Sequence, residues 1–224
     1  MIPIRDSEAV RRLSLISTIL IAANVAMFAY QDGIGRDAGA DLTRFAMTPA
    51  LISHGHPLVR EARILATLLT SQFLHAGPLH LAGNMLYLFI FGPAVEARMG
   101  HRRFLEFYLS AGVAAGLATV AMEPSSPVAV VGASGAIAGV LGAYFFLFPG
   151  GRIATFILVR IINVPAILYL LSWFAVQLYY GIMSSAPGAI VGGVAWWAHV
   201  GGFLFGVAVG PLLARPPATA RRRR

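Results

Sequence analysis

The sequence contains no cysteine, and this absence already removes several kinds of chemistry. Disulfide bonds, thiolate nucleophiles and cysteine-ligated metal ions are all excluded. Charged side chains are also scarce, at 12% of the 224 residues, whereas 58% are hydrophobic and the mean hydropathy is +0.74. A water-soluble domain would need far more polar surface, so the composition indicates a protein with several membrane spans.

Apolar runs long enough to cross a bilayer, which takes about 20 residues, recur along the chain. We therefore predict an all-α membrane protein, built as a polytopic bundle of six transmembrane helices. A short N-terminal segment, 1–12, and a basic tail, 214–224, flank the membrane domain 13–213. The predicted spans lie near 13–30, 79–95, 104–122, 132–148, 161–181 and 194–213.

Lysine is absent too, so all 17 basic residues are arginines, and their placement predicts the orientation of the chain. If the N-terminus is cytoplasmic, arginines gather in the cytoplasmic loops, and the short outer loops near 123–131 and 182–193 contain none. This positive-inside pattern places both termini in the cytoplasm. The arginine run 221–224 is then expected against anionic lipid rather than nucleic acid. In the long outer loop, the apolar segment 64–74 is too short to cross and is expected at the membrane surface.

Four polar residues of the predicted spans fall at one membrane depth. His80 and Asn84 are four residues apart, so they share a helical face at the outer end of the second span. Ser134 lies at the outer start of the fourth span, and His199 lies a few residues into the sixth. At a rise of about 1.5 Å per residue, all four lie within roughly two turns of the outer surface. Because polar groups are expensive to bury in a membrane, this shared depth favours a functional site.

The stretch VVGASGAIAGVLGAY, residues 130–144, has two interpretations. Its small residues favour the close packing of membrane helices, and a serine among them can simply hydrogen-bond a neighbouring helix. Alternatively, Gly132 and Gly135 leave the backbone free to bend and keep Ser134 uncovered, as a nucleophile requires. The two interpretations are compatible, and the sequence favours both together.

A nucleophilic serine needs a general base and donors for the oxyanion. His199 is a candidate base, and the donors can come from the Ser134 backbone N–H, the His80 ring and the Asn84 carboxamide. The last acidic residue is Glu123, so the last three spans contain no carboxylate for a Ser-His-Asp triad. A dyad is therefore predicted, with the imidazole oriented by packing or by a neutral hydrogen bond. Without an H-E-x-x-H motif or suitably spaced acids, neither a metal site nor another cofactor is predicted.

With these residues in view, the chain resembles the rhomboid family of intramembrane serine proteases. The resemblance implies that Ser134 is the nucleophile and His199 the base, and that His80, Asn84 and Gly132 form the oxyanion side of the site. It covers nearly all of residues 40–213. The matching segments are TSQFLHAGPLHLAGNMLYL, the E-A-R-M-G after the second span, GASGAIAGVLGAY and GGVAWWAHVGGFLFG.

The implied substrates are single-pass transmembrane proteins, cut in or near the outer end of their span through an acyl-enzyme. The implied location is a bacterial cytoplasmic membrane, with the site opening to the outer side. Two departures stand out: Ala138 replaces an aromatic that packs on the histidine in some rhomboids, and no tryptophan precedes Trp173 to match a Trp-Arg pair of some members. The alternative function is a catalytically silent relative that binds membrane clients for quality control or trafficking. The natural substrate and the oligomeric state stay open.

Overall fold

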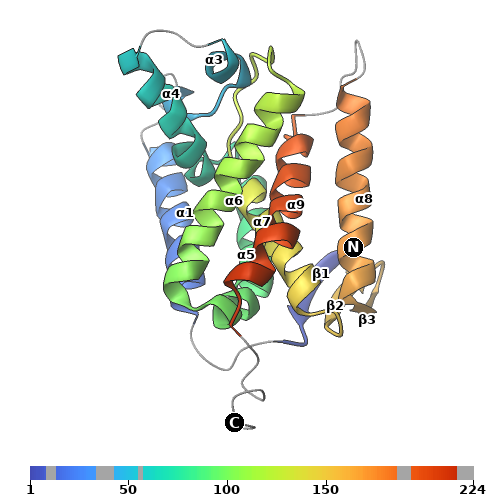
Figure 1. Cartoon of the computed structure of the whole chain (residues 1–224). Coiled ribbons are helices and arrows are strands. Elements are labelled where there is room, and N and C mark those ends of the chain that lie inside the picture. The colour runs from blue at the N-terminus through green and yellow to red at the C-terminus, as the bar shows by residue number, and fades with distance from the viewer. Residues whose placement is uncertain (9–13, 34–42, 55–57, 186–192, 216–224) are drawn as a thin grey trace.

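The computed structural model describes residues 1–8, 14–33, 43–54, 58–185 and 193–215 (Figure 1). The arginine run 221–224 and most of the outer loop 182–193 lie outside these residues. Among the described residues, five helices are long and apolar enough to cross a membrane, and a sixth apolar helix is shorter. The predicted polytopic helical bundle is therefore confirmed. The six helices are α1 (Leu15–Gly33), α5 (Pro78–Met99), α6 (His101–Met122), α7 (Ser134–Leu147), α8 (Ala166–Ser184) and α9 (Trp196–Leu213).

Short helices connect α1 to α5 at one end of the bundle (Figure 1). The apolar segment 64–74, except for its last residue, lies in two of them, and it packs directly on α6. A Cβ on Gly116 of α6 would lie 2.7 Å from the Leu68 side chain, and one on Gly112 would lie 2.1 Å from the Gln72 side chain. That this segment lies at the membrane surface stays a prediction. The connecting elements are η2 (Thr43–Phe45), α3 (Pro49–Ser53), α4 (Leu58–Thr70) and η3 (Ser71–Phe73).

A three-stranded antiparallel sheet occupies the opposite end of the bundle (Figure 1). Its strands, in the order β1-β2-β3, are β1 (Ile2–Asp6), β2 (Arg152–Ile157) and β3 (Arg160–Pro165). The sequence predicts no strand here and a fifth span from about 161, whereas residues 160–165 form β3 and the helix begins only at Ala166. The residues there are β-branched as well as apolar, which suits a strand. Pro165 then stands at the N-cap of α8, where its missing N–H costs no helical hydrogen bond.

Helix α7 lies in the core, and its contact with α9 is made by glycines. A Cβ on Gly142 would lie 2.0 Å from the Phe203 carbonyl oxygen of α9. In the other direction, a Cβ on Gly202 would lie 2.1 Å from the Gly135 carbonyl oxygen of α7. No side chain fits into such contacts, so the backbones of the two helices touch. This confirms that the small residues of the 130–144 stretch serve close helix packing.

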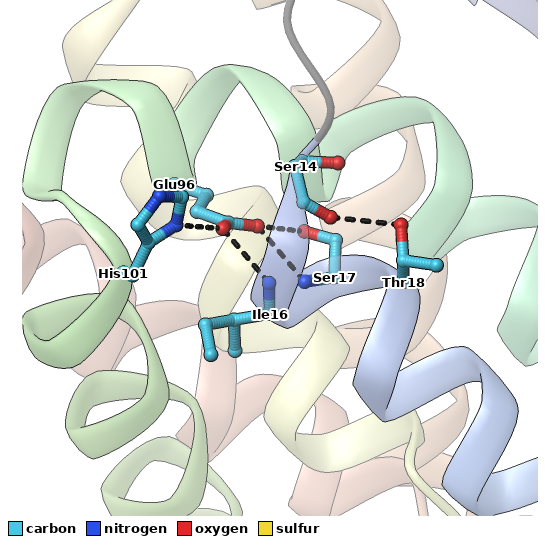
Figure 2. Close-up of polar contacts among 6 residues, drawn as sticks. All are labelled: Ser14, Ile16, Ser17, Thr18, Glu96 and His101. Carbon is cyan, nitrogen blue, oxygen red and sulfur yellow. Dashed lines mark hydrogen bonds and ion pairs between the residues drawn. The ribbon is translucent and has the colours of Figure 1, made fainter.

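The start of α1 is fastened to the end of α5 by Glu96 (Figure 2). This carboxylate, only 1% exposed, accepts hydrogen bonds from the N–H groups of Ile16 at 2.9 Å and Ser17 at 2.8 Å. The Ser17 hydroxyl donates to it at 2.7 Å, and His101 Nδ1 lies 2.5 Å away. The first N–H groups of a helix have no acceptor within the helix, so the carboxylate caps α1 and complements its dipole. Glu96 is the acidic residue of the E-A-R-M-G segment.

Candidate active site

The site begins at Gly132, two residues before the serine. Its backbone φ of +124° is rarely adopted by residues other than glycine. Its N–H donates to the Ser71 carbonyl at 2.9 Å. A Cβ at this position would lie 2.7 Å from His80 Cε1, 2.8 Å from His80 Nε2 and 3.5 Å from Asn84 Nδ2. The His80 and Asn84 side chains therefore lie directly against the backbone that leads into Ser134. Glycine is required here both by the conformation and by the space.

His75, for which the sequence predicted no role, orients Asn84. The Asn84 Nδ2 atom lies 2.9 Å from His75 Nε2, so the amide donates and the ring accepts. Burial and then the nearby His80 lower the pKa of His75 to about 4, which keeps the ring neutral and able to accept near pH 7. Its backbone is held by Gln31 of α1, whose Oε1 accepts from the His75 N–H at 3.1 Å. No motif signals this role, because it depends on contacts between segments distant in sequence.

Ser134 is the first residue of α7 and its side chain is partly exposed. The first helical hydrogen bond runs from the Ile137 N–H to the Ala133 carbonyl, at 3.0 Å. The N–H groups of residues 134–136 therefore have no acceptor within the helix. Together with the helix dipole, they favour an anion at this N-terminus. Within the described part of the chain, the Ser134 hydroxyl makes no hydrogen bond.

His199 lies in the first turn of α9 and is held from α8. Its Nδ1 atom is 2.7 Å from Oε1 of Gln177, and the Trp173 ring lies beside it with the centroids 5.8 Å apart. The Trp196 ring meets it at right angles, with 6.3 Å between centroids. The sequence predicted an imidazole oriented by packing or by a neutral hydrogen bond, and the structure contains both. It did not identify the two α8 residues that supply them.

The predicted site residues lie in the first two turns of α5, α7 and α9, or directly before α7 in the case of Gly132. Next to the serine, a Cβ on Gly135 would lie 3.7 Å from both the Cβ and the carbonyl oxygen of Ala198, the residue before His199. The two chain segments that carry Ser134 and His199 are therefore in contact. No cluster of three acidic or histidine side chains suited to a metal ion occurs among the described residues.

Fold and site together define a multi-pass helical membrane protein with serine, histidine and amide side chains gathered at one end of its bundle. A family model described as "Rhomboid domain" matches residues 62–216, which include all the predicted site residues. The chain belongs to the rhomboid family.

Three curated relatives show how far the similarity extends. Over 80 residues the chain is 44% identical to "Putative rhomboid protease YdcA" of Bacillus subtilis, a match covering 36% of this chain and 40% of that protein. It is 45% identical over 85 residues to "Rhomboid protease GluP" of the same organism, covering 38% and 16%. To "Rhomboid protein 1, mitochondrial" of Saccharomyces cerevisiae it is 30% identical over 164 residues, covering 70% and 44%. The chain spans less than half the length of these relatives.

Proposed function

We propose that the protein is an intramembrane serine endopeptidase with Ser134 as nucleophile and His199 as general base. The observation that carries the proposal is the contact of His80 and Asn84 with Gly132, directly before the start of α7. These side chains lie beside the unpaired N–H groups of the first turn of α7, so several donors surround the position next to the serine. Such a concentration of donors suits the stabilisation of an oxyanion.

The proposed reaction has two steps. His199 Nε2 takes the proton of the Ser134 hydroxyl as its oxygen attacks the carbonyl carbon of the scissile peptide bond. The oxyanion accepts hydrogen bonds from the Ser134 N–H, the His80 ring and the Asn84 amide, and one such side-chain amide contributes about 100- to 1000-fold in rate. The imidazolium gives its proton to the leaving amine, which departs and leaves an acyl-enzyme. Water, deprotonated by His199, then attacks the ester and releases the acid and the free serine.

The proposed substrates are single-pass transmembrane proteins, cut in or near the outer end of their span. The location of the candidate residues at one end of the apolar bundle supports this, because a substrate helix lying beside it meets them near its own end. The arginine distribution supports a bacterial cytoplasmic membrane with cytoplasmic termini and a site that opens outward. The run 221–224 is proposed to contact anionic lipid.

The test is co-expression with a tagged single-pass substrate, together with labelling by a fluorophosphonate probe. Ser134→Ala is expected to abolish both cleavage and labelling, and His199→Ala to reduce both strongly. Ser110→Ala is a matched control, because this serine is exposed on α6. Normal cleavage by a well-expressed Ser134→Ala protein would sink the proposal. A wild-type protein that binds membrane proteins, yet neither cleaves nor is labelled, would instead indicate a catalytically silent relative.

A further inference from the structure

Gln177 lies in the middle of α8 and is almost fully buried, at 6% exposed, although its side chain is polar. Both ends of its carboxamide are used. Nε2 donates to the Trp173 carbonyl of its own helix at 3.3 Å, and Oε1 lies 2.7 Å from His199 Nδ1. Because the carbonyl of Trp173 can only accept, it fixes which end of the amide faces the histidine. Gln177 therefore presents an oxygen to the ring.

This oxygen determines the tautomer of His199. A carboxamide oxygen accepts and cannot donate, so a hydrogen bond at this distance requires the proton to be on Nδ1. The neutral ring then carries its lone pair on Nε2, which is the atom a serine base needs. In a Ser-His-Asp triad the aspartate performs this task, and the wrong tautomer is strongly deleterious.

We propose that Gln177 is a positioning residue that holds His199 in the Nδ1-protonated tautomer, in place of the acid of a triad. This inference rests on the proposed protease function. One turn earlier on α8, the Trp173 ring lies with its centroid 5.8 Å from that of the imidazole, so α8 sets both the tautomer and the plane of the ring. The residue acts on the reaction only through His199.

The surroundings of His199 make this role open to measurement by pH. His80 of α5, which lies against Gly132 before the start of α7, is a titratable group of the same site. Helices α7, α8 and α9 contain no Asp, Glu or Arg within their bounds. A carboxylate introduced at 177 would therefore be the only acidic group on these helices and would favour the protonated imidazole.

Two variants separate positioning from a structural role. Gln177→Leu removes the hydrogen bond at similar volume, and we expect kcat to fall about tenfold or more with little change in KM. Gln177→Glu keeps an acceptor for Nδ1 and adds charge, and we expect the acid limb of kcat/KM to move to higher pH while activity exceeds that of Gln177→Leu. Ser172→Ala is the control, because among the described residues its hydroxyl bonds only within α8, to the Tyr169 carbonyl at 2.8 Å.

Nitrogen-15 NMR of histidine-labelled protein gives a readout that does not need activity. The wild type is expected to show His199 protonated on Nδ1, and Gln177→Leu to show a mixture of tautomers. Wild-type kcat in a folded Gln177→Leu protein, or an unmoved pH limb in Gln177→Glu, would overturn the positioning role. So would a wild-type His199 protonated on Nε2. An inactive wild type would instead overturn the proposed protease, and the tautomer measurement would still decide whether Gln177 orients the ring.

Discussion

A single methyl group at position 206 tests how closely α7 and α9 must approach. A Cβ there would lie 2.0 Å from the Gly139 carbonyl oxygen, 2.8 Å from the Gly139 carbonyl carbon and 2.9 Å from the Ala143 nitrogen. All three are backbone atoms, so no change of side-chain rotamer relieves the overlap. An ordinary contact begins at 3.4 Å, and the difference from 2.0 Å means that the helices must separate locally by about 1.4 Å.

The cost of Gly206→Ala follows from this displacement. Overpacking of a well-packed core costs about 1–3 kcal/mol, and backbone contacts place this substitution toward the upper end. Alanine returns about 1 kcal/mol of helix propensity, which leaves a destabilisation of about 2 kcal/mol. Position 206 is about two turns from His199, so part of the displacement reaches the ring. Since a misplacement of about 1 Å can cost about 100-fold in rate, we expect cleavage to slow about 10- to 100-fold.

The assay measures two quantities for each variant and for the wild type: the unfolding temperature in detergent and the cleavage rate of a tagged substrate. Gly33→Ala is the matched control, because a Cβ at the end of α1 meets nothing within 4 Å. We expect that variant to keep wild-type stability and activity. If Gly206→Ala unfolded and cleaved like the wild type, the inference that close α7–α9 contact sets the site geometry would be wrong.

Three further predictions concern single residues, one at the far end of α5 and two in the site. Glu96→Gln should lower the free energy of unfolding by about 1–3 kcal/mol, because it removes a buried charged acceptor. The control Glu106→Gln changes an exposed side chain and should alter this free energy by less than about 1 kcal/mol. Equal effects of the two substitutions in chemical denaturation would contradict the capping role. Gly132→Ala should abolish fluorophosphonate labelling while the circular dichroism stays helical. The added Cβ would overlap the His80 ring, and the positive φ at this position is strained for alanine. Undiminished labelling would refute this prediction. For His75, the folded pKa of about 4 lies below the usual 6.5, so its stabilising contribution is complete above 6.5 and is lost as the pH falls toward 4. The unfolding temperature should therefore fall more steeply over that window in the wild type than in His75→Gln, and parallel curves would show that another group is responsible.

The membrane helices could be predicted because lipid leaves the backbone few alternatives, and a continuous apolar run then reads as a helix. Helix α6, predicted at 104–122, is observed at His101–Met122, and α9, predicted at 194–213, at Trp196–Leu213. The β2–β3 hairpin could not be predicted in this way, because its residues are as apolar as those of a membrane span. Hydropathy alone does not distinguish a β-branched hairpin from the start of a helix.

The candidate site was predictable to the extent that its members are polar residues in apolar spans. Ser134, His199, His80 and Asn84 stood out in this way, and they lie at one end of the bundle. Gln177 satisfies the same criterion and could have been found by it. Its pairing with His199 could not be predicted, because it depends on how α8 is placed beside α9, and that placement is set by packing across the bundle.

The alanine at position 138 is explained by the same packing. Ala138 is completely buried, and a Cβ on Gly202 of α9 would lie 3.2 Å from the Ala138 Cβ. The α9 backbone at Gly202 therefore lies next to the Ala138 Cβ, which leaves no room for an aromatic ring directed from 138 toward Gly202. The support for His199 must then come from another helix, and α8 supplies it with Trp173 and Gln177. The glycines set the distance between α7 and α9, and α8 sets the orientation of the imidazole. The alanine at 138 on α7 and the glutamine at 177 on α8 are therefore linked, because close packing by the first leaves the support of His199 to the second.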